Sequence, residues 1–225
     1  MAQQAYKRDV LQRIAGVAFI LGAIATIVFN VIAPRADDQS DMAKVYAALS
    51  KNPDLGKLAF FGLAVGIWLL VAGFMGVYRS ITTGAASAWA RLGFYGVVVS
   101  SGLISAAFAL FVGAIMAAEQ GQTAIPTMTA IVTAGQSLFA VAVVGWWLAL
   151  AFVGLGMLLS TAYPKWTGWV LLVLGVVTVG ISGVPSVFST PTENQQLIFG
   201  VLAGLTSLWA LVVGVWVTRR EMKAM

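Results

Sequence analysis

The chain of 225 residues contains no cysteine and no histidine. The absence of cysteine excludes disulfides, thiolate metal sites, Fe–S clusters and a cysteine nucleophile. The absence of histidine excludes imidazole ligands for haem or copper and an imidazole general base. The sequence therefore favours a protein that is not an enzyme. It predicts no metal and no cofactor, although a bound lipid is compatible with it.

Charged residues are also scarce, at 9% of the chain, whereas 60% of the residues are hydrophobic and the mean hydropathy is +0.93. A soluble domain typically carries about 25% charged residues. A protein core of this size could not bury so much apolar side chain, so the remainder must face lipid. The composition predicts a polytopic integral membrane protein of the all-α class.

Six apolar stretches are long enough to span a membrane, which requires about 20 residues in a helix. The connections between them are too short to form a further domain, so residues 1–225 are predicted to form a single helical bundle. Short connections also favour antiparallel packing of consecutive helices. The predicted spans are residues 14–33, 58–78, 92–118, 131–159, 166–187 and 197–217.

The distribution of Lys and Arg predicts how the bundle is oriented. If the N-terminus is cytoplasmic, nine of the 13 cations lie on the inner side and four on the outer side, which agrees with the positive-inside rule. Six spans then place both termini in the cytoplasm. The cations are scattered beside apolar stretches, so no nucleic-acid partner is predicted. The inner set is Lys7, Arg8, Arg13, Arg79, Arg91, Lys165, Arg219, Arg220 and Lys223, and the outer set is Arg35, Lys44, Lys51 and Lys57.

A short amphipathic helix is predicted in the first outer loop, residues 34–57. Ser40 suits the N-cap and Asp41 the first turn, and Asn52-Pro53 ends the helix. One face is apolar because hydrophobic residues recur at i, i+3, i+4 and i+7. The helix is predicted to be an interfacial connector, with a lid or partner-docking element as the alternative. Its apolar residues are Met42, Val45, Tyr46 and Leu49.

Small residues mark the predicted helix contacts, because lipid provides no hydrophobic drive for helices to associate and small side chains let backbones approach. Gly62 and Gly66 are four residues apart in one span, as are Gly200 and Gly204 in another. A longer series with the same spacing places span 92–118 at the centre of the bundle or at a subunit contact. That series is Ser101, Ser105, Ala109, Gly113 and Ala117.

The middle of every predicted span lacks Asp, Glu, Lys and Arg, which argues against proton coupling, voltage sensing and a carboxylate metal site. The neutral polar residues in the spans could line a pocket or pore for a small solute. The favoured alternative is that each bonds a neighbouring helix or its own i−4 carbonyl. Asn30 and Gln136 are the candidate buried polar residues, since an unpaired amide is costly in hydrocarbon.

Several of the eight tryptophans are predicted to anchor the bundle at the membrane surface. Trp89, Trp166 and Trp169 flank predicted helix starts on the inner side, and Lys165 adds a positive charge there. Trp146 and Trp147 are adjacent and point about 100° apart on a helix. Packing in the core is favoured for them, whereas the alternative has one of them contact lipid, a pigment, a quinone or a partner.

Two short motifs open predicted spans, R13-I-A-G-V-A-F-I-L-G22 at the first and P164-K-W-T-G-W169 at the fifth. Together with six helices in a chain of this length, they make the chain resemble small six-helix bacterial membrane proteins of the domain-of-unknown-function type. The resemblance implies a bacterial cytoplasmic (inner) membrane, and it supplies no catalytic residues.

Three functions are consistent with these features, and membrane lipids are expected partners in each. The favoured function is a non-catalytic membrane subunit or scaffold that packs with itself, as a homo-oligomer, or with a larger membrane complex. The second is a carrier or channel for a small neutral or apolar solute. The third is a membrane enzyme acting on a lipid or quinone, which the missing His and Cys disfavour.

Overall fold

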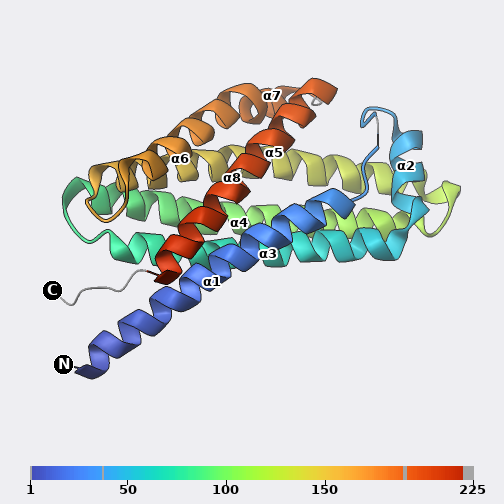
Figure 1. Cartoon of the computed structure of the whole chain (residues 1–225). Helices are drawn as coiled ribbons and strands as arrows, with labels where there is room; N and C mark the ends of the chain where they lie inside the picture. The colour runs from blue at the N-terminus through green and yellow to red at the C-terminus, as the bar shows by residue number, and fades with distance from the viewer. Residues whose placement is uncertain (1, 37, 190–191, 220–225) are drawn as a thin grey trace.

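The computed structural model describes residues 2–36, 38–189 and 192–219 (Figure 1). For residues 2–9 and 193 it describes the backbone and not the side chain. The regular structure in the described ranges is entirely helical, and the described residues form no strand. The helices are α1 (Ala2–Ile32), α2 (Met42–Lys51), α3 (Pro53–Ser80), α4 (Gly84–Ala118), η1 (Gln122–Ala124), α5 (Ile125–Leu159), α6 (Lys165–Thr178), η2 (Val179–Gly183), α7 (Val184–Phe188) and α8 (Glu193–Arg219).

Six helical stretches are long and apolar enough to cross a membrane, which confirms the all-α class and the number of predicted spans. Five predicted spans lie inside these stretches, and the first extends one residue beyond α1. The observed helices are longer than the spans predicted from the sequence, because a helix continues beyond its apolar residues until a cap or a helix-breaking residue ends it. Asn52, for example, accepts a hydrogen bond from the Leu55 N–H at 3.2 Å, so α3 begins at Pro53. The stretches are Val10–Ile32, Pro53–Ser80, Gly84–Ala118, Gln122–Leu159, Lys165–Phe188 and Asn194–Arg219.

Helices α3, α4 and α5 lie side by side, and α6 packs on α5 (Figure 1). Helices α1 and α8 run obliquely across the same side of this layer. Consecutive spans are neighbours as expected from α1 to α6, but α8 packs chiefly on α1 and makes few contacts with α6. Glycines allow α1 and α8 to cross this closely, because a Cβ on Gly16 would lie only 2.9 Å from the carbonyl oxygen of Gly214.

An aromatic cluster occupies the junction of α1, α3, α5 and α8. The Phe74 ring lies 4.8 Å from that of Phe19 and 6.2 Å from those of Trp209 and Trp146, measured between centroids. All four side chains are buried. Aromatic pairs at such separations contribute about 0.5–1.5 kcal/mol each beyond the area they bury, so this cluster fixes how α8 meets the other helices.

The fifth span is not one regular helix. It changes from α6 to a π-helical turn, η2, and then to α7, whose first turn contains Pro185. Proline lacks the N–H of a helical hydrogen bond, and its ring displaces the carbonyl four residues earlier, which here belongs to Ile181. The wider π turn accommodates the proline within the span. Ser182, on this turn, is buried, and its hydroxyl has no hydrogen-bond partner among the described residues.

Candidate interaction surfaces

The small-residue series on α4 does not lie in one environment. Ser101 is fully buried and Ala117 nearly so, whereas Ala109 is exposed and Ser105 and Gly113 are half-buried. Four residues turn an α-helix by about 40° more than a full turn, so five such residues spread over about 160° of the helix surface. The series therefore passes from the core of the bundle to its outer surface and back.

A different set of small residues lies together on the exposed face of α4. Gly102, Ala106 and Ala109 are exposed and Gly113 is half-buried, with spacings of four, three and four residues. Among the described residues, no other helix comes within 4 Å of the position a Cβ would take on Gly102, and the nearest approach to that of Gly113 is Ile131 at 3.8 Å. The four-three-four spacing is visible in the sequence, but nothing in the sequence indicates that this face of α4 is the exposed one.

The two G-x-x-x-G pairs lie in contrasting surroundings. Gly62 lies against the Phe29 ring, and a Cβ on Gly66 would be 3.1 Å from the Thr26 nitrogen, so this pair adjoins α1. Gly200 and Gly204 on α8 have nothing described within 4 Å of their Cβ positions. The second pair makes no helix contact within the described chain.

The candidate buried amides are only half-buried. Asn30 accepts hydrogen bonds from Arg35 through both its side-chain oxygen and its backbone carbonyl, the latter at 2.9 Å, and these bonds stabilise the C-terminus of α1. Gln136, on α5, makes no side-chain hydrogen bond to another described residue. Neither residue lies in a polar cluster within the bundle.

Most hydroxyl groups in the spans bond within their own helix, to the carbonyl four residues earlier. This local satisfaction removes the need for a polar lining. Two hollows lie at the surface of the described structure, one on α6 at Trp169 and Val173 and one beside α2. The hydroxyls bonded in this way include those of Thr26, Ser101, Ser105, Thr178, Thr206 and Ser207.

The predicted anchor residues lie at one end of the bundle. Trp166 and Trp169 are exposed on one face of α6, whereas Trp89 is half-buried against Phe152 with ring centroids 5.4 Å apart. Lys165 has an additional role, because its ammonium donates to the backbone carbonyls of Leu158 and, at 2.9 Å, of Ser160. It therefore caps the C-terminal end of α5, where a cation is also favoured by the helix dipole.

Trp146 and Trp147 are both buried, at 7% and 3% exposure. Trp146 packs edge-on against Phe74, and Trp147 packs edge-on against Phe199, each with centroids 6.2 Å apart. Neither ring therefore faces lipid. Adjacent helical positions can both be buried here because α5 lies between α4 on one side and α6 on the other.

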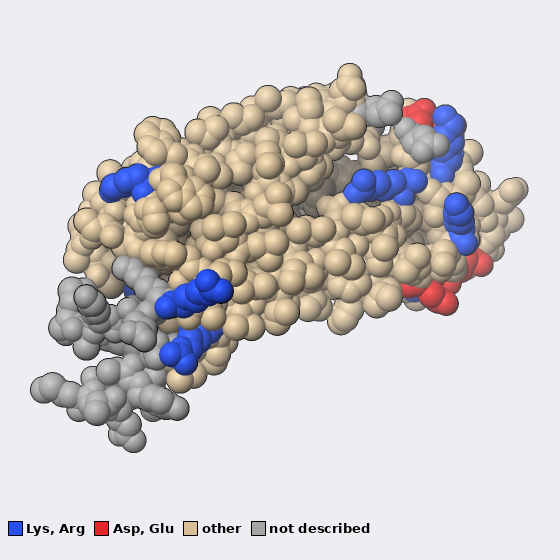
Figure 2. Space-filling model, viewed as in Figure 1, with Lys and Arg blue, Asp and Glu red and all other residues tan. Residues whose placement is uncertain are grey.

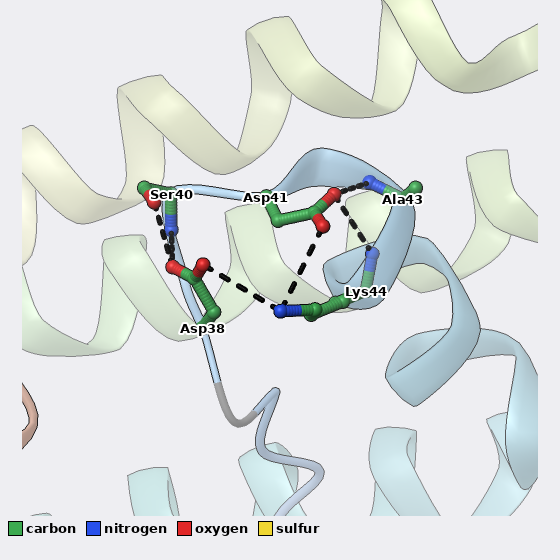
Figure 3. Close-up of polar contacts among 5 residues, drawn as sticks. All are labelled: Asp38, Ser40, Asp41, Ala43 and Lys44. Atoms are coloured by element: carbon green, nitrogen blue, oxygen red, sulfur yellow. Dashed lines mark hydrogen bonds and ion pairs between the residues drawn. The ribbon is translucent and has the colours of Figure 1, made fainter.

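The connection before α2 forms a polar network (Figure 3). Asp41, not Ser40, is the N-cap of α2: its carboxylate accepts from the Ala43 N–H at 2.9 Å and the Lys44 N–H at 3.4 Å. Ser40 donates its hydroxyl and its N–H to Asp38, at 2.6 and 2.9 Å. These two bonds lower the pKa of the Asp38 carboxyl below its ordinary value of 3.8.

A second hollow, of about 270 Å³, lies between the segment that follows α1 and one face of α2. Arg35, Lys44 and Lys51 line it together with Ala36, Ala47 and Ala48. Figure 2 shows Lys and Arg side chains around this end of the bundle, one of them beside a depression in the surface. The described residues contain no group of three or more acids or other ligating side chains that could hold a metal ion.

On the face that Figure 2 shows, the charged side chains of the described residues lie toward the two ends of the bundle, and the middle has none. Glu119, at the end of α4, bonds Lys57 of α3 at 2.7 Å. The structure does not describe the side chains of Lys7, Arg8, Arg220 and Lys223.

Comparisons with family models, with curated proteins and with solved structures find no match to this chain.

Proposed function

We propose that this protein is a non-catalytic subunit or scaffold of the bacterial cytoplasmic membrane. It packs with copies of itself, or with a larger membrane complex, through helix faces rich in small residues. The observation that carries the proposal is the exposed face of α4, on which Gly102, Ala106, Ala109 and Gly113 leave a shallow track three turns long.

Such a track suits another helix better than it suits lipid. Small side chains let two helix backbones approach closely, and close approach is what drives association where no hydrophobic gain is available. Gly102 and Ala109 are seven residues apart, as are Ala106 and Gly113. A seven-residue repeat keeps the contact on one side of a helix that packs at a small crossing angle, as in left-handed membrane bundles.

The bundle itself supports a structural role over a catalytic one. Most of the described hydroxyls in its spans bond within their own helix, and the hollows beside α2 and α6 lie at the surface. The described side chains also form no cluster of acids in the spans. A carrier would need polar groups directed at a common cavity, so that function has less support than a scaffold.

Both termini are proposed to lie in the cytoplasm, with α2 on the outer side, because nine of the 13 cations then lie inside. Reporter fusions after Arg219 and within residues 34–41 test this orientation. A cytoplasmic reporter active after Arg219, with an exported reporter active in the loop, is the expected result. The reverse pattern would overturn the orientation.

Because the chain has no native cysteine, single cysteines provide a clean test of the α4 contact. Ala106→Cys in native membranes should give a disulfide-linked dimer or a cross-link to a larger partner. Val173→Cys, on the exposed face of α6, is the matched control and should give neither. Equal cross-linking of both variants would refute α4 as the contact.

The Gly102→Leu variant tests the same surface without disturbing the fold, since no other helix of the described structure comes within 4 Å of the Cβ position. We expect normal insertion and thermal stability in detergent, together with loss of the larger species in mass photometry. A wild-type protein that is monomeric in native nanodiscs and copurifies with nothing in stoichiometric amount would refute the scaffold proposal.

A further inference from the structure

Three cationic side chains line the hollow beside α2. Lys44 and Lys51 are seven residues apart on one face of α2, with Ala47 and Ala48 between them, and Arg35 faces them from the segment after α1. The two lysines are separated by about 10 Å along the helix axis. Because Ala47 and Ala48, which share this face with the lysines, have small side chains, both lysine chains border the same depression.

The N–H donors of these three side chains are only partly engaged in hydrogen bonds or ion pairs with described residues. Arg35 directs one nitrogen, Nη2, to Asn30, which leaves most of its five N–H groups free. Lys44 lies 3.7 Å from the Asp38 carboxylate and 3.9 Å from that of Asp41, and these exposed pairs are weak. Lys51 makes no hydrogen bond or ion pair with another described residue.

The charge of the lining points to an anionic ligand. The residues that line the hollow include three cations and, among the described residues, no acid. A tetrahedral phosphate group presents several oxygens that can accept from Lys and Arg at once. Lysine serves as a point charge for phosphate, and arginine can bind it through two N–H groups.

The size of the hollow suits a small group. Pockets for drug-sized molecules are about 300–1,000 Å³, and 270 Å³ is slightly below that range. A phosphate with its linking atoms fits this space.

The position of the hollow favours a lipid as the source of that phosphate. Val28 and Val31 are exposed on the last turns of α1, and Arg35 follows three residues after α1 ends. An acyl chain lying against these valines would bring its phosphate to the level of Arg35. Cationic side chains attract anionic headgroups that lie within a Debye length of them.

We propose that this hollow binds the phosphodiester headgroup of an anionic phospholipid. Arg35, Lys44 and Lys51 donate to the phosphate oxygens, and the alanines between the lysines leave room for the group. The lipid would join the end of α1 to α2, two elements that are connected in sequence by the polar segment 33–41.

The test uses the full-length protein in mild detergent, titrated with phosphatidylglycerol or with phosphatidylcholine and analysed by native mass spectrometry. The wild-type protein should retain one phosphatidylglycerol and bind phosphatidylcholine at least about tenfold more weakly. Lys51→Gln should weaken phosphatidylglycerol binding several-fold, and Lys51→Gln combined with Arg35→Gln at least about tenfold. Arg91→Gln, an exposed cation on α4 remote from the hollow, is the matched control and should bind as the wild type does.

Lys51→Gln keeps the test independent of folding, since Lys51 bonds no other described side chain, and its melting temperature should equal that of the wild type. Unchanged phosphatidylglycerol binding by the double variant would overturn the proposal. Inorganic phosphate, added as a competitor, separates the two sources of the ligand. If phosphate displaces the lipid at equal concentration, the site binds a free anion and the lipid proposal fails; if it does not, the lipid assignment is supported.

Discussion

The indole N–H of Trp209, in the last span, donates a 2.9 Å hydrogen bond to the backbone carbonyl of Thr167, in the first turn of α6. Trp209 is 4% exposed, and its ring also lies 5.8 Å from that of Phe19 on α1. One side chain therefore connects α8 to two helices, although α6 and α8 otherwise make few contacts.

Trp209→Phe should lower the free energy of unfolding by about 1–2 kcal/mol, because it removes this hydrogen bond and part of the buried ring. Unfolding in mixed micelles of increasing SDS content measures the change. Trp166→Phe, at a position that is 51% exposed, is the control and should have an effect close to zero. Equal stability of the two variants would contradict the role given to Trp209.

Gly154→Val should destabilise the bundle by about 3 kcal/mol or more. A Cβ at Gly154 would lie 2.6 Å from the nitrogen of Leu172 and 2.8 Å from the carbonyl oxygen of Gly168, and backbone atoms of a packed helix cannot yield as a side chain can. Gly200→Val, with open space around it, should leave the unfolding curve unchanged. A similar loss in both variants would mean that α5 and α6 are not in this close contact.

Lys165→Met should lower stability by about 1 kcal/mol, because the carbonyls of Leu158 and Ser160 lose their charged donor. Lys165→Arg retains a donor of similar reach and should retain most of the stability. The measurement is thermal unfolding in detergent, with reporter fusions to confirm that the topology is unchanged. If Lys165 acts only as a topology signal, Lys165→Met will unfold as the wild type does.

The sequence was sufficient to predict the helical class and the six spans, because length and composition alone determine which segments can cross a bilayer. It could not predict which face of each helix lies inside. In a soluble helix the polar face identifies the outside, but in a membrane both the core and the lipid-facing surface are apolar. Ser101 and Ala109 show the consequence, since they belong to one regular series yet one is buried and the other exposed.

The roles of individual polar residues depended on local geometry that a pattern does not contain. Ser40 and Asp41 are both good N-cap residues, and only the backbone path selects Asp41. Lys165 was assigned to the membrane surface from its charge, but its reach to the end of α5 depends on how tightly the chain turns at residues 160–164. The packing of α8 on α1 is likewise a long-range property, set by Gly16 and Gly214.

The role of Asp41 as the N-cap of α2 can be tested by substitution. Asp41→Ala should cost about 1 kcal/mol of local stability, because the N–H groups of Ala43 and Lys44 lose their acceptor. Ser40→Ala should leave these two amides protected. Hydrogen exchange of the Ala43 and Lys44 amides distinguishes the variants, and faster exchange in Ser40→Ala instead would contradict the observed cap.

The Asp38 carboxyl should make the segment before α2 sensitive to acid. Its pKa is lowered in the folded protein, chiefly by the hydroxyl of Ser40 and then by the Ser40 N–H, so the ionised form is favoured there. The resulting stability is present above the unfolded pKa of about 3.8 and is lost as the pH falls through the lower folded value.

Hydrogen exchange of the Ser40 amide, corrected for its intrinsic rate, should therefore be slow at about pH 6 and faster below about pH 3. Asp38→Asn, which cannot ionise, should remove the pH dependence. Ser40→Ala retains the backbone donor but loses the hydroxyl, so its transition should begin at a higher pH than that of the wild type. A transition at the same pH in Ser40→Ala and wild type would show that the hydroxyl does not hold the Asp38 pKa down.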